Sequence, residues 1–502
     1  MWKLIKRIFL LLPALLAELV FMLLIVTVLE PWAILIELVL NIAGFCVVFF
    51  LVSYRQEGAY RTLWLLFFTF TPVAATVAYL FFGNKRTVKP ILKKISTAIY
   101  QMPHDVPQNN ELSKITQEEK RIGESLRYLN NLSSFPVMPC ESSEYYPLGE
   151  DCLKGMIEEM EKAEKYIFLE YFIVEDGSMW KRMTDVLAEK VKNGVDVRMI
   201  YDDLGSISTF SGRDTNYLKK IGIKYIAFNP LKFVNGTLNN RSHRKMLIID
   251  GHTVFSGGIN IADEYINEKK RFGHWKDIGF KITGPAVWNY LYMFSVFWNA
   301  YSEDRIGEEQ FSAIPKTPSV LDGSVLSYCD SPGNHDALSN NFYIEMLGNV
   351  TDRAWFYTPY LMLGDNLLDA FIRAAQRGVD VRVIIPGIPD KKMPYKMTKN
   401  YAESLMHAGV RVYAYTPGFI HAKACIFDDK VCTVGTVNLD YRSLYLHFEN
   451  NSVFYDSSIM KELEKDYLNT VSVSTELVPK KKYRSFSSYV VNGIIRVFSP
   501  LC

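Results

Sequence analysis

Residues 165–200 read KYIFLEYFIVEDGSMWKRMTDVLAEKVKNGVDVRMI, and residues 352–385 read DRAWFYTPYLMLGDNLLDAFIRAAQRGVDVRVII. Each stretch runs from an apolar strand through a loop and an amphipathic helix to G-V-D-V-R and a second apolar strand. Gly194 and Gly378 stand where the glycine that ends a helix belongs. Strands that alternate with helices in this way indicate βαβ units. The repetition predicts an α/β fold of two tandem halves, with mixed, mainly parallel sheets, that form a pseudo-two-fold pair.

Each half continues through a further short helix, which we expect over 216–221 in the first half and over 401–408 in the second. The first half then carries an insertion at residues 229–242, NPLKFVNGTLNNRS. Its Asn and Gly content is typical of a loop. The two halves are therefore expected to differ mainly by one surface loop.

The same motif follows in both halves. Residues 243–250 read HRKMLIID, and residues 421–428 read HAKACIFD. Six residues further on, the chain reads GGIN at 257–260 and GTVN at 435–438. A His and a Lys two positions apart on a strand point to the same face. One imidazole and one ammonium from each half can therefore face a common cleft.

These residue types fit phosphodiester chemistry. One neutral His attacks phosphorus and forms a phospho-histidine, while the other, protonated, gives its proton to the leaving alcohol and later acts as a base. Lys and Asn side chains stabilise the charge on the phosphate oxygens. The candidate catalytic residues are His243, Lys245, Asp250, His421, Lys423 and Asp428, and the candidate phosphate-binding residues are Asn260 and Asn438. We expect no metal ion and no cofactor, because no ligand cluster with zinc spacing is present.

The motif aspartates allow two interpretations. Asp250 and Asp428 sit where the strand turns back into a hairpin, which favours a structural role over a reacting one. A catalytic His also needs a partner for its second nitrogen. Asp277 and Glu449, each downstream of its respective histidine and flanked by apolar residues, are the candidate orienting carboxylates, with an ordinary ion pair as the alternative. The remaining histidines lack the motif and are taken as structural or surface residues: His104, His252, His274, His335, His407 and His447.

The N-terminal part is almost purely apolar. Three stretches, Ile8 to Leu29, Trp32 to Val52 and Thr62 to Phe82, each approach the roughly 20 residues that cross a bilayer as a helix. They predict a membrane anchor over 1–90 with two to three transmembrane helices. The largest basic cluster follows Phe82, which places the soluble part in the cytoplasm.

The remainder divides into four segments. We expect a juxtamembrane linker over 91–135, the first repeat over 136–315 and the second over 316–478. The tail, 479–502, reads PKKKYRSFSSYVVNGIIRVFSPLC. Its basic cluster and helical apolar spacing suit an anionic membrane surface, and packing on the second repeat is the alternative.

Composition excludes several classes of protein. The formal net charge of the 502 residues is +2, so nothing points to nucleic acid as a partner. The seven cysteines form no C-x-x-C pattern, which argues against a disulfide framework and a structural zinc site.

Several motifs together resemble one family. RSHRKMLIIDG and GTVNLDYRSLYLHFE, with EYFI at 170–173, YDDLGS at 201–206 and TPYL at 358–361, resemble the phospholipase D superfamily and, within it, the bacterial cardiolipin synthases. The similarity covers roughly residues 60 to 502. The apolar stretches before Arg61 depart from the family pattern, as does His447, which stands where Asn is common.

The resemblance implies two phospholipase D-like repeats behind N-terminal transmembrane helices, in a multi-pass protein of the bacterial cell membrane. It implies that one phosphatidylglycerol gives its phosphatidyl group to the enzyme, releasing glycerol, and that a second phosphatidylglycerol attacks to give cardiolipin. By this analogy His243 is the nucleophile and His421 the acid and base. Anionic membrane lipid is then a partner, and homo-oligomerisation stays open.

Three rival functions remain. A phospholipase D or a nuclease of the superfamily would use water as the acceptor, although the N-terminal spans disfavour a nuclease. A transferase could use a different alcohol, such as serine or ethanolamine. A membrane scaffold without activity would not need paired histidines in reach of one phosphate.

Overall fold

The computed structural model describes residues 30–53, 57–79, 88–102, 110–230, 239–333, 336–479 and 486–501, with Pro107 and scattered positions between 16 and 27. The chain forms two compact units, which are described separately. The terminal unit comprises Met1–Pro90, Lys232–Gly236 and Arg484–Cys502. The main unit comprises Ile91–Leu231 and Thr237–Tyr483.

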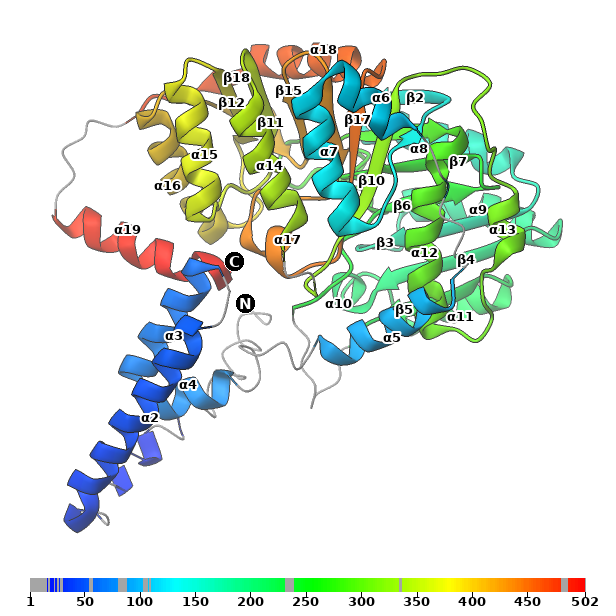
Figure 1. The fold of residues 1–502 in the computed structure, drawn as a ribbon. Helices are drawn as coiled ribbons and strands as arrows, with labels where there is room; N and C mark the ends of the chain where they lie inside the picture. The colour runs from blue at the N-terminus through cyan, green and yellow to red at the C-terminus, as the bar shows by residue number, and fades with distance from the viewer. Residues whose placement is uncertain are drawn as a thin grey trace. The chain divides into compact units, whose positions relative to one another are not determined.

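The terminal unit is helical (Figure 1). Its elements are η1 Glu30–Trp32, α2 Ala33–Ser53, α3 Gly58–Phe70, α4 Pro72–Ala78, α19 Phe486–Phe498 and η4 Ser499–Leu501. Helix α2 exposes large apolar side chains, among them Ile34 at 85% and Phe49 at 72%. Within the described residues, no helix has both the length and the apolar character needed to cross a membrane. The transmembrane helices stay a prediction, and much of the stretch from Ile8 to Leu29 lies outside the described residues.

The C-terminal helix α19 belongs to the terminal unit. It packs against α3, where the rings of Phe67 and Phe498 lie 6.5 Å apart, edge to face. This contact lies within the terminal unit, so it does not support the alternative in which the tail packs on the second repeat, and membrane binding by the tail stays a prediction. The basic cluster of the tail, residues 480–484, lies outside the described residues.

The segment expected to be a linker is largely helical. It holds α5 Lys89–Tyr100, α6 Glu111–Glu118 and α7 Lys120–Ser133. Helix α7 packs against α14 of the second repeat, and Asn341 donates a 2.8 Å hydrogen bond to the Tyr128 hydroxyl. The buried face of α7 makes this segment part of the main unit.

The first repeat holds a seven-stranded sheet in the order β2-β9-β7-β6-β3-β4-β5. Its elements are β2 Ser142–Tyr146, α8 Gly149–Lys162, β3 Tyr166–Tyr171, α9 Ser178–Lys192, β4 Asp196–Asp202, α10 Asp203–Ser206, α11 Gly212–Lys220, β5 Lys224–Phe228, β6 Met246–Ile249, β7 Thr253–Gly257, β8 His274–Lys276, β9 Gly279–Thr283, η3 Gly284–Ala286, α12 Val287–Tyr301 and α13 Glu308–Ser312.

The second repeat holds a nine-stranded sheet in the order β1-β10-β17-β16-β15-β11-β12-β13-β18. Its elements are β10 Ser324–Asp330, α14 Leu338–Asn349, β11 Arg353–Tyr357, α15 Asp365–Gln376, β12 Asp380–Pro386, α16 Lys392–His407, β13 Arg411–Tyr415, β14 Gly418–Ile420, β15 Ala424–Phe427, β16 Val431–Gly435, α17 Tyr441–Tyr445, β17 Glu449–Tyr455, α18 Ile459–Ser472 and β18 Ser474–Glu476.

The two sheets share one topology, which confirms the tandem repeat. In each sheet the three βαβ strands are parallel, β3-β4-β5 in the first and β11-β12-β13 in the second. The other pairings of the described strands in these sheets are antiparallel. The sheets are thus mixed as expected, but "mainly parallel" is wrong. Each motif strand folds back as a hairpin, and a short hairpin joins antiparallel neighbours.

The central strand β3 is buried along its whole length. Ile167 and Leu169 face a core built with α8 and α9, while Phe168 stacks on Phe294 of α12 at 5.0 Å. Cover on both faces explains why the strand reads as a continuous apolar run. Gly194 and Gly378, at φ 89° and 94°, end α9 and α15 as expected, since a left-handed residue favours glycine.

Strands are also exchanged between the repeats. β1, Met138–Pro139, lies at the start of the first repeat, ahead of β2, but pairs with β10 of the second sheet. β8 of the first repeat pairs in parallel with β14 of the second. The repeats are therefore interlocked rather than merely adjacent.

The motif aspartates hold the start of each central strand. Asp250, at φ 51°, accepts hydrogen bonds from the backbone N–H groups of Glu164, Lys165 and Tyr166 at 2.7 to 2.8 Å. Asp428, at φ 48°, binds the backbone of 351–353 in the same way at 2.9 to 3.0 Å. Both carboxylates therefore tie the hairpin turn to the neighbouring strand.

This role predicts a difference between two adjacent aspartates. Asp428→Ala removes three charge-assisted hydrogen bonds and is expected to lower the free energy of unfolding by about 2–3 kcal/mol. Asp429→Ala is the matched control, because Asp429 is exposed and only pairs with Arg353 at 2.7 Å, a surface contact worth less than about 1 kcal/mol. Denaturant titration of both variants measures the difference. Equal losses would contradict the structural role.

Candidate active site

The two motif histidines are each held by backbone from the opposite repeat. The N–H of His243 donates to the carbonyl of Phe448 at 2.8 Å, and the N–H of His421 donates to the carbonyl of Lys276 at 2.7 Å. The β8–β14 pairing places the second contact. Each histidine therefore precedes its own motif strand but is positioned by the partner repeat.

The orienting carboxylates are crossed between the repeats. Nδ1 of His243 lies 2.9 and 3.0 Å from the two carboxylate oxygens of Glu449. Nδ1 of His421 lies 2.6 Å from Asp277. The sequence analysis identified both carboxylates but matched each to the histidine of its own half, and that matching is wrong. All four side chains are buried.

This pairing defines the tautomer of each ring. An ionised carboxylate only accepts hydrogen bonds, so the proton of a neutral imidazole beside it lies on Nδ1 and the lone pair on Nε2. Asp277 fixes His421 in this way, and Glu449 does so for His243 in its ionised form. The ammonium of Lys423 also lies 2.7 Å from Nδ1 of His421. An ammonium group cannot accept a hydrogen bond, so Asp277 is the acceptor for the N–H of the ring. Nε2 of each ring is thus the nitrogen available for chemistry.

The motif lysines are buried beside their histidines. Nζ of Lys245 donates to the carbonyl of His243 at 2.6 Å, and Nζ of Lys423 donates to the carbonyl of His421. Burial lowers the pKa of Lys245 to about 7 and that of Lys423 to about 8. Two buried ammonium groups are stabilised by an anion bound beside them, such as a phosphate group.

The histidines respond to the same environment. Burial and then the charges of Lys245 and Lys423 hold the pKa of His243 well below its usual range, and His421 contributes to the lowering. Burial and then Lys423 lower the pKa of His421 to about 4, while Asp277 acts in the opposite direction. Charges of each motif thus act on the histidine of the other motif, which is consistent with one shared site.

The two carboxylates differ in ionisation. Burial raises the pKa of Glu449 to about 7. Burial also acts to raise the pKa of Asp277, but the charges of His421 and Lys423 outweigh it and the pKa lies below its usual value. Asp277 is therefore a firm anion at neutral pH, whereas Glu449 is close to its titration point. This difference breaks the symmetry of the two halves.

The phosphate-binding candidates are placed differently from each other. Asn260 is buried, accepts the N–H of Ile173 at 3.1 Å and donates to the hydroxyl of Tyr265 at 2.7 Å. Asn438 is also buried, and its Oδ1 has no hydrogen-bond partner within the described residues. Asn260 thus fastens the loop after β3, and Asn438 retains unused hydrogen-bonding capacity.

Two buried ion pairs hold the loop that carries His243. Arg241 binds Asp202 through Nε at 2.9 and 3.0 Å. Arg244 binds Glu170 at 2.6 and 3.0 Å. Glu170 and Asp202 belong to the EYFI and YDDLGS motifs, so these segments serve to neutralise and position the arginines on either side of His243.

The sequence analysis missed His447. Its ring centroid lies 5.9 Å from that of His243, and its Nδ1 lies 3.9 Å from Glu449. It stands two positions before Glu449, a spacing that puts both side chains on one face of an extended chain. This spacing in the sequence could have identified His447 as a neighbour of Glu449.

The other described histidines lie on separate contacts. His252 lies 3.3 Å from Glu141, and His407 lies 3.3 Å from Glu403. His274 shares a hydrogen bond of 2.8 Å with the Tyr415 hydroxyl. His104 and His335 lie outside the described residues.

Comparison with known proteins identifies the family. The family model described as "Cardiolipin synthase, PLD-like domain" matches residues 156–271 and 343–470. The chain is 36% identical to an uncharacterized protein of Streptococcus mutans, covering 90% of this chain and 99% of that one. It is 30% identical to a cardiolipin synthase of Clostridium perfringens, covering 89% of this chain and 95% of the other.

A solved structure supports the fold alone. The crystal structure of phosphatidylserine synthase from Haemophilus influenzae superimposes with a TM-score of 0.56 at 18% identity, covering 75% of this chain and 98% of that one. The length and identity of the sequence matches carry the assignment. The chain belongs to the cardiolipin synthase family of proteins with phospholipase D-like domains.

Proposed function

We propose that this protein is a phosphatidyltransferase that converts two phosphatidylglycerol molecules into cardiolipin and glycerol. The observation that carries the proposal is the pair of imidazoles, each fixed at Nδ1 by a carboxylate of the other repeat and each beside a buried lysine. Such an arrangement offers one nucleophile, one proton carrier and two cations to a single phosphodiester. The names of relatives agree with it.

In the first step, Nε2 of His243 attacks the phosphorus of phosphatidylglycerol. A P–N bond forms, the P–O bond to glycerol breaks, and His421 in its protonated form gives a proton to the departing glycerol oxygen. In the second step, the terminal hydroxyl of another phosphatidylglycerol attacks phosphorus and loses its proton to His421. The P–N bond breaks, and His243 is released.

The ionisation of the carboxylates supports this division of roles. Asp277 is a firm anion, so it stabilises an imidazolium at His421. Burial and the two lysines keep His243 neutral, as a nucleophile must be. An anionic phosphodiester that enters beside Lys245 and Lys423 offsets their charges and raises the pKa of both histidines. Substrate therefore favours the protonated state that His421 needs.

Asp250 and Asp428 fall outside this scheme. Their carboxylates accept backbone N–H groups at the start of β3 and β11. We propose a structural role for both, in place of the catalytic role considered from the sequence.

The product distinguishes this function from hydrolysis or use of another alcohol. Purified full-length protein incubated with labelled phosphatidylglycerol in detergent micelles is expected to release glycerol and accumulate cardiolipin, because a second lipid hydroxyl resolves the intermediate. Lipid chromatography with mass detection measures both products. Phosphatidic acid as the sole product would indicate a hydrolase instead, and a product formed only when serine or ethanolamine is added would indicate a different transferase.

The roles of the two histidines are separable by trapping. His243→Ala is expected to abolish both turnover and acid-quenched labelled phosphatidyl-enzyme, because the attacking nitrogen is gone. His421→Ala is expected to slow turnover by at least about 100-fold, the typical contribution of an acid–base group, while some labelled enzyme still accumulates. Loss of trapping in His421→Ala with retention in His243→Ala would reverse the assignment.

We propose further that the protein is anchored in the bacterial cell membrane by its N-terminal apolar helices, with the main unit at the cytoplasmic face. The exposed apolar side chains of α2 support burial in lipid. The basic cluster that follows Phe82 supports the orientation. Exposed Val490 and Ile494 of α19, at 45% and 53%, suit the same surroundings.

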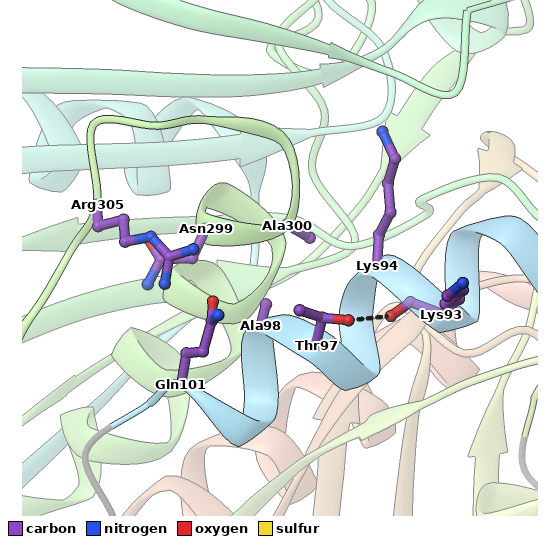
Figure 2. Close-up of a pocket in the computed structure, with 8 residues that line it drawn as sticks. All are labelled: Lys93, Lys94, Thr97, Ala98, Gln101, Asn299, Ala300 and Arg305. Atoms are coloured by element: carbon purple, nitrogen blue, oxygen red, sulfur yellow. Dashed lines mark hydrogen bonds between the residues drawn. The ribbon is translucent and has the colours of Figure 1, made fainter.

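A basic cavity suits the anionic lipid of such a surface. The cavity of ≈ 270 Å³ lies between α5 and the end of α12 (Figure 2), and no carboxylate lines it. The residues that line it are Lys93, Lys94, Thr97, Ala98, Gln101, Asn299, Ala300 and Arg305. Its cations are expected to hold the main unit against anionic headgroups.

Substitution of two separate pairs of consecutive lysines tests whether the cavity binds anionic headgroups. Lys93→Gln/Lys94→Gln is expected to lower the ratio of activity on phosphatidylglycerol bilayers to activity in micelles by about 30-fold, since each of the two lysines near an anionic surface contributes about 1 kcal/mol. Lys219→Gln/Lys220→Gln on α11 is the matched control and is expected to leave the ratio unchanged. The assay uses reconstituted full-length protein. An equal fall in both variants would show that general charge, not the cavity, matters.

A further inference from the structure

Three side chains of metal-ligand type, contributed by both repeats, converge at the candidate active site. The ligand atoms of His243, His447 and Glu449 all lie within 4.8 Å of one another. His243 comes from the first repeat and the other two from the second, so only the fold brings them together.

The spacing of these atoms approaches that of a coordination shell. Nδ1 of His243 lies 2.9 Å from Glu449, and Nδ1 of His447 lies 3.9 Å from the same carboxylate. Two tetrahedral zinc ligands are separated by about 3.3 Å, given bonds of roughly 2.0–2.2 Å. A small side-chain adjustment would therefore equalise the separations.

His447 has no other task in the described part of the chain. Its Nε2 is buried without a hydrogen-bond partner, and its side chain is only 11% exposed. A metal ion that binds at Nδ1 would therefore displace no hydrogen bond of this ring within the described residues.

We propose that His243, His447 and Glu449 form a binding site for a divalent transition metal such as Zn²⁺, and that the bound ion blocks the enzyme. Two imidazoles and one carboxylate are donors that zinc accepts, and three protein ligands leave a fourth position open. The ammonium groups of Lys245 and Lys423 repel the ion, so the affinity is expected to be lower than at a structural zinc site.

Blocking follows from the position of the ion. A cation held by His243 and Glu449 displaces the hydrogen bond that orients the ring and withdraws electron density from the imidazole. The nucleophile is then both misplaced and weakened. The inhibition rests on the proposed function, whereas metal binding itself does not.

Calorimetric titration of full-length protein in micelles with ZnCl₂ tests the binding. The parent is expected to take up one Zn²⁺ per chain, and His447→Asn is expected to weaken binding at least about 100-fold, the upper range for loss of a group that only supports a ligand. His252→Asn is the matched control, because His252 is 48% exposed and has a single carboxylate neighbour. It should bind as the parent does.

A second arm measures glycerol release from phosphatidylglycerol with zinc or with a chelator, each variant compared with its own metal-free rate. Zinc should inhibit the parent and His252→Asn, but not His447→Asn, and chelation should never abolish activity. Parent-like zinc binding by His447→Asn, or no saturable binding by the parent, would overturn the site. One bound Zn²⁺ without inhibition would overturn the blocking role. Absence of glycerol release in every sample would fault the proposed function and leave the binding result standing.

Discussion

Each motif histidine of this protein depends on a carboxylate that the other repeat supplies. Asp277 and Glu449 are fully buried, and a buried carboxylate without a partner is destabilising by several kcal/mol. The two crossed contacts therefore satisfy two carboxylates and orient two imidazoles at once. They also make the halves interdependent, because displacement of one repeat would leave an unpaired charge in the core of the other.

The same crossing gives the two similar halves carboxylates of different ionisation. The repeat supplies equal sets of His, Lys and Asp, and a perfect two-fold pair would give both imidazoles one pKa. Replacement of an aspartate by a glutamate at the corresponding position, with different neighbours, leaves one carboxylate ionised and the other near pKa 7. In the proposed mechanism, this difference of one side-chain length separates the proton carrier from the nucleophile.

Sequence reasoning reached the halves, the motif residues and both carboxylates, because periodicity and spacing are local signals. It failed where the result depends on which strand lies beside which. The crossed partners, the pairing of β1 with β10 and the antiparallel pairings other than the two motif hairpins join residues far apart in the sequence, and local spacing does not reveal them. His447 was missed because an isolated histidine is ordinary in sequence and becomes unusual only beside His243. The helices over 91–135 were underestimated because polar residues on their exposed faces are typical of a linker.

The exchange of β1 bears on how the chain is synthesised and folded. Met138 and Pro139 leave the ribosome long before β10, to which they pair, and Asp277 likewise precedes His421. During synthesis the first repeat therefore lacks the strand that pairs with β1 and the histidine that pairs with Asp277 until most of the chain has been translated. Native contacts of such sequence separation slow folding. If His243 is the nucleophile, as proposed, a nascent chain that ends before residue 449 lacks the carboxylate that orients it, and such an interrupted product is expected to be inactive.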